Sequence, residues 1–332
     1  MENMNNTITD VSGILVGHAQ DMEALTGCTV VICEKGATAG IDQRGGAPGT
    51  RETDALRPMH LVDSAHAILL TGGSAYGLDA AAGVMRYLEQ KNIGFNTGVA
   101  RVPIVASAVI FDLALGKPQV RPDASMGYNA CMNATNSPVV QGNVGVGTGA
   151  SIGKILGMRG AMKAGIGSAS IYIGKGIYVG ALMAVNAFGD VINPQNGQII
   201  AGARSVQFGK IRIGKAGHFI DTLQTMKSFI GRNIMAFSSK HNTVIGVVAT
   251  NARLTKEEVN KVAQMAHNGI ARTIRPAHTM LDGDTVFALA TNQRKADVST
   301  IGAFAAEAVS QAILNAIFNA SAAGGIPSIN DL

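Results

Sequence analysis

The stretch HNTVIGVVAT, residues 241–250, divides the sequence into two parts of different character. Residues 193–242 before it are basic, polar and rich in glycine, with few periodic apolar positions, which predicts an exposed and mobile segment. From Thr243 to Thr250 the chain is β-branched and apolar almost without a break. Such a run is typical of a short strand that is buried on both faces. We therefore expect a central strand that begins abruptly at Thr243.

The residues after this strand predict a helix, a second buried strand and a final helix. Thr255 and Glu258 have the spacing of a capping box, and an apolar residue recurs at helical intervals from there to Ile270. TVFALAT, residues 285–291, is another apolar β-branched run. The alanine-rich segment 298–322 predicts a long helix that ends before Gly324 and Gly325.

The part before residue 193 also predicts strands and helices in alternation. CTVVIC, residues 28–33, indicates a strand, and the glycine-rich polar segment 41–54 indicates a long loop. Residues 65–90 predict a strand, a glycine turn and a helix. Short β-branched runs between glycines in residues 142–185 predict adjacent strands. The chain is therefore expected to form an α/β fold with a large buried sheet.

Composition limits the class of protein. The 332 residues are 47% hydrophobic and 15% charged, with a mean hydropathy of +0.21, which indicates one large domain or two intimate ones and surface covered by other subunits. We find no run of 18 uncharged apolar residues and no signal peptide, so we expect a cytoplasmic protein outside the membrane. Three cysteines without a CxxC spacing suggest buried free thiols.

Charge and short motifs speak against several ligands. The net charge of +5 is spread along a chain without tryptophan, so we expect no nucleic acid partner. The seven histidines lack the spacing of a helical metal site, and we expect no metal. GVGTGASIGK, residues 145–154, lacks the last glycine of a dinucleotide motif and the Ser or Thr of a P-loop. We therefore expect no bound cofactor.

Five polar residues could together carry chemistry, namely Thr243, Lys154, Asn186, Asp282 and Asp284. Each also has an ordinary structural interpretation: a strand former, a solvated residue at a helix start, a loop residue, and the two carboxylates of a turn. A threonine hydroxyl is a weak nucleophile, but a threonine at the start of a chain can use its own α-amine as the base. The set therefore favours a threonine nucleophile that chain cleavage exposes.

Eight stretches resemble the P1 family of self-processing aminopeptidases, the DmpA-type β-peptidyl aminopeptidases, and within it look most similar to the nylon-oligomer (6-aminohexanoate oligomer) endohydrolases. They occur in the expected order between residues 8 and 291. The stretches are ITDVSGILVGHA (8–19), RGGAPGTRETD (44–54), LLTGGSAYGLDAAAGV (69–84), RVPIVASAVIFDL (101–113), GNVGVGTGASIGK (142–154), MAVNAFGDV (183–191), HNTVIGVVATNA (241–252) and MLDGDTVFALAT (280–291).

The resemblance implies that Asn242-Thr243 is the bond that the protein cleaves in itself and that Thr243 is the nucleophile. It implies that Lys154 and Asn186 lie beside the nucleophile, and that the carboxylates of Asp282 and Asp284 are its polar partners. The aminopeptidase branch has a serine nucleophile and a Ser-x-Glu pair where Asp-Gly-Asp stands in this chain. This difference favours the nylon-oligomer branch.

The resemblance also implies a four-layer αββα sandwich of the DmpA and ornithine-acetyltransferase type. The single domain 1–332 would be cut into fragments 1–242 and 243–332, which form a heterodimer and assemble further into a tetramer of heterodimers. Short peptides or 6-aminohexanoate oligomers would be the substrates, and no cofactor is needed. We also expect the turn with Gly72, Gly73, Ser74 and Tyr76 to line the substrate pocket.

Three other interpretations of the sequence stay open. The first is a β-peptidyl or L-aminopeptidase of the same family. The second is an ornithine-acetyltransferase-like enzyme, which would transfer the acyl group to an amine instead of water. The third is an unprocessed glycine-rich binding protein, in which Asn242-Thr243 is only the junction of a loop and a strand.

Overall fold

A nine-stranded sheet forms the centre of the computed structural model, which describes residues 5–208, 211–215, 217–228 and 242–332. β1 (Leu15–Asp21) pairs with β2 beside the main path of the sheet. That path runs in the order β10 (Ile166–Tyr172), β11 (Tyr178–Asn186), β18 (Thr243–Arg253), β20 (Thr285–Lys295), β2 (Thr26–Gln43), β4 (Ser64–Thr71), β7 (Val105–Val109) and β3 (Thr50–Arg51).

The long strand β2 joins two layers of this sheet. Its first part, Cys28–Ile32, pairs with β4 and with β1, and the pairing with β4 is irregular between Ile32 and Ala37. Its last part, Thr38–Gln43, pairs with β20 instead. The sequence predicted a strand only over residues 28–33 and a loop from residue 41. The predicted strand is too short, because residues 41–43, of which Asp42 and Gln43 are polar, pair with the main chain of β20.

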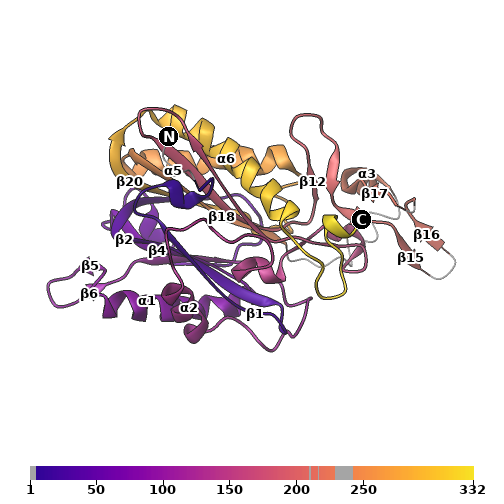
Figure 1. Cartoon of the computed structure of the whole chain (residues 1–332), viewed down its shortest axis with the longest axis horizontal. Coiled ribbons are helices and arrows are strands. Elements are labelled where there is room, and N and C mark those ends of the chain that lie inside the picture. Colours follow the sequence, from indigo (N-terminus) through magenta and orange to yellow (C-terminus); the bar gives the residue numbers. More distant parts are fainter. Residues whose placement is uncertain (1–4, 209–210, 216, 229–241) are drawn as a thin grey trace.

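Helices cover both outer faces of the two layers (Figure 1). α5 (Lys256–Thr273) and α6 (Val298–Phe318) pack over β10, β11, β20 and the second part of β2. α1 (Ala80–Gln90) and α2 (Ala124–Met132) pack over β1 and the first part of β2. The order of layers is helix, sheet, sheet, helix, which confirms the predicted four-layer α/β sandwich.

Side-chain alternation along β2 fills the core on both sides of its layer. Val30 and Ile32 pack against α1 and α2, whereas Val31 joins the large core between the two layers. Neighbouring side chains of a strand point to opposite faces, so a strand with helices on one face and a sheet on the other is apolar throughout. The apolar run CTVVIC therefore reflects burial on both faces.

Strand β18 lies between β11 and β20, which confirms that it is a central strand of the sheet. It is antiparallel to β11, with Thr243 opposite Asn186, and parallel to β20, with Ile245 opposite Thr285. Residues 243–252 are all buried. This register places the first residue of β18 next to the last residue of β11.

The predicted helices are present, with different ends. The capping box of Thr255 and Glu258 begins α5. α6 ends at Phe318 with Asn319 as its C-cap, four residues before the predicted end, because the following chain turns back through a bridge between Ala323 and Ile326. By length and composition alone α6 could cross a membrane, yet it packs against β10, β11 and α5.

The segment after residue 193 is more ordered than its composition indicated. It contains α3 (Thr222–Lys227) and short strands, and buried Asp190 accepts hydrogen bonds from Ala203 N–H, Thr222 N–H and Thr222 Oγ1. These bonds explain why residues 201–203 and Thr222 are buried, where the sequence predicted an exposed stretch, whereas the predicted mobility stays a prediction. Residues 209–210, 216 and 229–241 lie outside the described residues. The short strands are β13 (Ile199–Ala201), β14 (Ala203–Arg204), β15 (Val206–Phe208), β16 (Ile211–Ile213) and β17 (Phe219–Ile220).

Candidate active site

The hydroxyl group of Thr243 lies against the peptide bond that precedes it. Thr243 Oγ1 donates a hydrogen bond of 2.5 Å to the carbonyl oxygen of Asn242, and the backbone N–H of Gly283 donates to the same oxygen at 2.8 Å. The side chains of Asn242 and Thr243 are both buried. The Thr243 hydroxyl and the carbonyl group of Asn242 are thus held together away from solvent.

The segment Asp282-Gly283-Asp284 precedes β20 and runs beside the start of β18. The main chains of Asn242 and Asp282 form a parallel bridge. The Asp284 carboxylate accepts the backbone N–H of Val244 at 2.7 Å, and its other oxygen lies 2.8 Å from His278 Nδ1. Asp282 and Asp284 are both buried, with at most 2% of their surface exposed. The predicted turn therefore contacts both sides of the Asn242-Thr243 bond.

Burial, and to a lesser extent the charge of Asp284, raise the pKa of Asp282 to about 6. Hydrogen bonds from the backbone N–H and the hydroxyl of Thr279, at 3.0 and 2.5 Å, act in the opposite direction because they stabilise the ionised form. Two carboxylates this close resist simultaneous ionisation. Asp282 can therefore take up or release a proton near neutral pH.

Lys154 and Asn186 form a second polar unit on the other side of Thr243. Lys154 Nζ donates to Asn186 Oδ1 at 2.6 Å and to the Asn186 carbonyl oxygen at 3.0 Å. Asn186 Nδ2 donates to the Phe111 carbonyl at 3.0 Å, and Asn186 Oδ1 also accepts the backbone N–H of Ser151. Because Asn186 lies opposite Thr243 in the register of β11 and β18, this unit adjoins the nucleophile.

Burial lowers the pKa of Lys154 to about 7, against the opposing charges of Asp282 and Asp112. The interpretation of Lys154 as a solvated helix-start residue is wrong, since only 3% of it is exposed. An uncharged amine accepts a proton, and an amine with a pKa near 7 is uncharged in a large fraction of molecules at neutral pH. The structure thus brings all five predicted residues to the start of β18 and gives one of them the character of a base.

The glycine turn of residues 72–76 contacts this site through Asp112. The backbone N–H of Gly73 donates to Asp112 Oδ1 at 2.7 Å, and Gly72 packs directly against the other carboxylate oxygen. Ser74 N–H bonds to the main chain of Ile110. Tyr76 is 62% exposed, and its ring lies 3.8 Å from the guanidinium carbon of Arg121. The contacts of this turn are structural, and its substrate-lining role stays a prediction.

Sequence reasoning missed Asp112 and His278, two polar groups of the site, and it missed the buried Lys163, which bonds to backbone carbonyl groups outside the site. Asp112 accepts the Thr26 hydroxyl at 2.7 Å, and burial raises its pKa. Lys163 Nζ donates to three backbone carbonyl groups, and burial lowers its pKa to about 7. The available signal was a lone charge within an apolar run, in IFDLA for Asp112 and in GAMKAG for Lys163.

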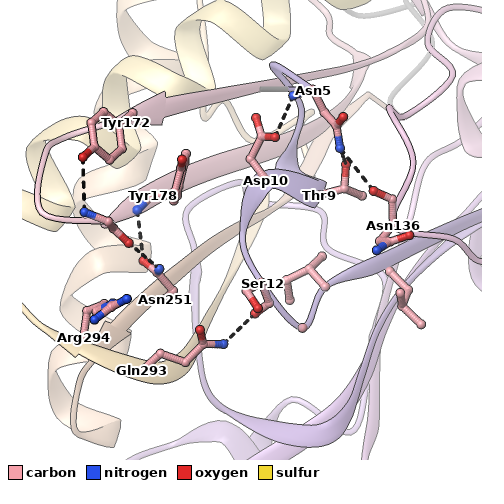
Figure 2. A pocket seen from close by; sticks show the side chains of 14 residues that line it. Asn5, Thr9, Asp10, Ser12, Asn136, Tyr172, Tyr178, Asn251, Gln293 and Arg294 are labelled. Atoms are coloured by element: carbon pink, nitrogen blue, oxygen red, sulfur yellow. Dashed lines mark hydrogen bonds between the residues drawn. The ribbon is translucent and has the colours of Figure 1, made fainter. Parts of the chain in front are cut away.

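A groove of about 950 Å³ lies at the other end of β18, beside Asn251 and roughly 25 Å along the strand from Thr243 (Figure 2). Asn5 and Asp10 hydrogen bond to each other in its wall, Asn251 bonds to the main chain of Gly176, and Gln293 bonds to Ser12. Binding sites need polar groups that converge on a ligand. These groups already satisfy one another, so we place the chemistry at Thr243.

A four-layer fold with a buried threonine at the start of a central strand is the architecture of N-terminal-nucleophile hydrolases. The chain belongs to peptidase family S58, whose model matches residues 6–328. It is therefore an enzyme of the peptidase and amide hydrolase class, which speaks against the glycine-rich binding protein.

Relatives in this family have two kinds of name. The chain is 43% identical to an uncharacterized aminopeptidase of Mycobacterium tuberculosis over 98% of both chains. It is 32% identical to a 6-aminohexanoate-oligomer endohydrolase of Kocuria sp., over 92% of this chain and 84% of that protein. The predicted family is confirmed, and both of its branches are represented.

Solved structures agree on the fold. The L-aminopeptidase D-Ala-esterase/amidase of Ochrobactrum anthropi, described as a variant of the Ntn hydrolase fold, superposes with a TM-score of 0.71 at 20% identity and covers 98% of this chain and 90% of its own. A Burkholderia β-aminopeptidase superposes with a TM-score of 0.70 at 21% identity, over 99% and 92%. At this identity the likeness concerns the fold alone.

Proposed function

We propose that this chain is the precursor of an amide hydrolase that cleaves its own Asn242-Thr243 bond and then uses Thr243 as its nucleophile. The observation that carries the proposal is the contact between the Thr243 hydroxyl and the Asn242 carbonyl oxygen within a buried site. A hydroxyl held against a carbonyl group avoids most of the entropy that a bimolecular attack loses. Lys154 bonds to Asn186, the residue opposite Thr243 in the sheet, and supplies a group able to accept a proton.

Self-cleavage proceeds by an N-to-O acyl shift. Thr243 Oγ1 bonds to the Asn242 carbonyl carbon and gives its proton to the uncharged amine of Lys154, while the carbonyl π electrons move to the oxygen. The tetrahedral intermediate then collapses to the carbonyl group of the ester and releases the Thr243 nitrogen, which takes the proton back from Lys154 and becomes a free α-amine. Water hydrolyses the resulting ester, so that Asn242 ends as a carboxylate and Thr243 regains its hydroxyl.

The mature enzyme repeats this chemistry on a substrate amide. Thr243 attacks the substrate carbonyl, and its α-amine or Lys154 takes the proton. In the precursor Asn186 Nδ2 is bonded to Phe111, so there we assign Asn186 to orienting Lys154. Its proposed stabilisation of the oxyanion belongs to the mature enzyme. Asp282 and Asp284 keep the start of β18 in place.

We propose short peptides and 6-aminohexanoate oligomers as the substrates, cut internally. The names of the relatives support this range. The three carboxylates described around the site, those of Asp112, Asp282 and Asp284, already accept hydrogen bonds from the protein. They are therefore poorly placed to bind the ammonium group that an aminopeptidase must recognise. The buried free thiols suit the cytoplasm, where we propose that the enzyme acts.

Cleavage should give two fragments that stay together. Fragment 243–332 contributes β18 and β20, which lie between β11 and β2 of fragment 1–242. Denaturing electrophoresis of the purified protein should show bands of about 25 and about 9 kDa, scaled from 34.2 kDa by residue number, and the small fragment should begin with Thr243. Size-exclusion chromatography should elute both fragments in one peak, at the size of the proposed tetramer of heterodimers. A single persistent band of 34.2 kDa in active protein would contradict the proposal.

The mode of cleavage can be tested with three 6-aminohexanoate oligomers of equal length. One carries a free amine, one a free carboxylate, and one is blocked at both ends. We expect all three to be hydrolysed at internal bonds, within about tenfold of each other, because burial and hydrogen bonding occupy the carboxylates of the site. Chromatography of the products identifies the bonds that are cut. If only the oligomer with the free amine reacts, and only at its first bond, the enzyme is an aminopeptidase.

A further inference from the structure

The main chain around Asn242 is paired on one side by the segment 281–283. Asn242 N–H donates to the Leu281 carbonyl at 2.9 Å, and the Asn242 carbonyl accepts the Gly283 N–H at 2.8 Å. The second of these bonds ends on the oxygen that would gain negative charge during self-cleavage. A backbone N–H in this position stabilises such an oxyanion when it is directed at the oxygen before the reaction begins.

Position 283 accepts only glycine without displacement of its neighbours. A Cβ atom there would lie 2.9 Å from Thr243 Oγ1 and 2.6 Å from the Ala47 carbonyl oxygen. Both distances are shorter than a normal contact of carbon with oxygen. The absence of a side chain thus lets the peptide group of Gly283 approach the hydroxyl and the carbonyl group at once.

The two aspartates hold this peptide group from both sides. Asp282 Oδ2 accepts the N–H of Thr279 at 3.0 Å, and Asp284 Oδ1 accepts the N–H of Val244 at 2.7 Å. The Asp282 carbonyl accepts the N–H of Ala47 at 2.9 Å. Fixed hydrogen bonds on each side leave the N–H between them little freedom to reorient. The donor is therefore in place before charge develops on the oxygen.

We infer that the backbone N–H of Gly283 is the oxyanion donor of self-cleavage and that the carboxylates of Asp282 and Asp284 position it. The inference rests on the proposed function, because it concerns the same carbonyl group. It gives the Asp-Gly-Asp sequence a role as a unit, in which the glycine supplies the catalytic N–H and the aspartates act through it.

The test replaces the N–H of Gly283 with an oxygen atom. Cell-free translation with a suppressor tRNA that carries glycolic acid at position 283 gives an ester in place of the Asp282-Gly283 amide. We expect self-cleavage after translation to slow by about 10²- to 10³-fold, as for the loss of one oxyanion donor. Electrophoresis against time measures the rate, and mass spectrometry separates cleavage at 242 from hydrolysis of the ester at 282.

The matched control places the same ester at Gly142, whose buried N–H also donates at 2.8 Å but to the Ile166 carbonyl. It should cleave at the rate of the unaltered chain. Equal rates for the ester at 283 and the ester at 142 would overturn the inference and leave the proposed function standing. An unaltered chain that does not cleave in the same translation would instead overturn the proposed function.

A second measurement tests the inference even if the protein with the ester at position 283 does not fold. In the uncleaved Thr243→Ala protein the Gly283 amide proton should be protected from hydrogen exchange, since its acceptor, the Asn242 carbonyl, is still present. Heteronuclear NMR of the 15N-labelled protein follows this proton directly. A Gly283 amide that exchanges as fast as those in exposed turns would show that it makes no such hydrogen bond, and the inference would fall.

Discussion

Thr243→Ala should leave the chain as one polypeptide of 34.2 kDa with no measurable amide hydrolysis. The change removes the hydroxyl that contacts the Asn242 carbonyl oxygen and would form the ester, so both self-cleavage and turnover should fall by about 10⁴-fold or more. The fold should persist, because the alanine leaves the Gly283 hydrogen bond to Asn242 intact. Electrophoresis and a hydrolysis assay on the same preparation measure both effects.

Two further variants separate the hydroxyl group from the rest of the side chain. Thr243→Ser keeps the hydroxyl and should still cleave. Thr250→Val is the matched control, since Thr250 is the other buried threonine of β18 and donates to the Tyr178 carbonyl at 2.9 Å. It should cleave normally while losing about 1 kcal/mol of stability. If the Thr243→Ala protein were still cleaved between residues 242 and 243, Thr243 would not be the nucleophile of self-cleavage.

The start of β18 could be predicted from the sequence because the local pattern of apolar residues matches the burial of the strand in the structure. The change from a polar segment to an apolar β-branched run at Thr243 is visible in one window of residues. The capping box of α5 is equally local. β2 was predicted too short because its last residues include the polar Asp42 and Gln43, which become part of a strand only through pairing with β20, distant in the sequence.

The site predicted from the sequence was also incomplete, because some of its groups are set by contacts between segments distant in the sequence. Thr243, Asp282 and Asp284 were found from a motif, but the second donor to the Asn242 carbonyl, from Gly283, is a backbone N–H, which every residue except proline possesses. Lys163 and Asp112 are charges whose burial depends on the whole fold. Residue types indicate which side chains can react, whereas the pairing of β18 with its neighbours decides which main-chain groups face the reacting bond.

Lys154→Met should slow self-cleavage by about 10²- to 10⁴-fold, the usual contribution of a general base. Methionine fills a similar volume but accepts no proton. In the precursor the Thr243 nitrogen is an amide, so it cannot substitute for Lys154 as it could in the mature enzyme. Burial lowers the pKa of Lys154 from 10.5 to about 7, and the base acts when it is uncharged. The wild-type rate should therefore rise about tenfold per pH unit below pH 7 and level off above it, as measured by electrophoresis after pH jumps.

Lys163→Met is the matched control, because Lys163 is a second fully buried lysine whose pKa burial lowers to about 7. Its Nζ bonds to the carbonyl groups of Gly147, Ala150 and Ala164, not to Asn186, so this variant should keep the wild-type pH profile even if it is less stable. Lys154→Arg should fail like Lys154→Met, since guanidinium stays charged at these pH values. If Lys154→Met kept the rise in rate through pH 7, the proton would go to another group, and Asp282, with its pKa raised to about 6, would be the next to replace.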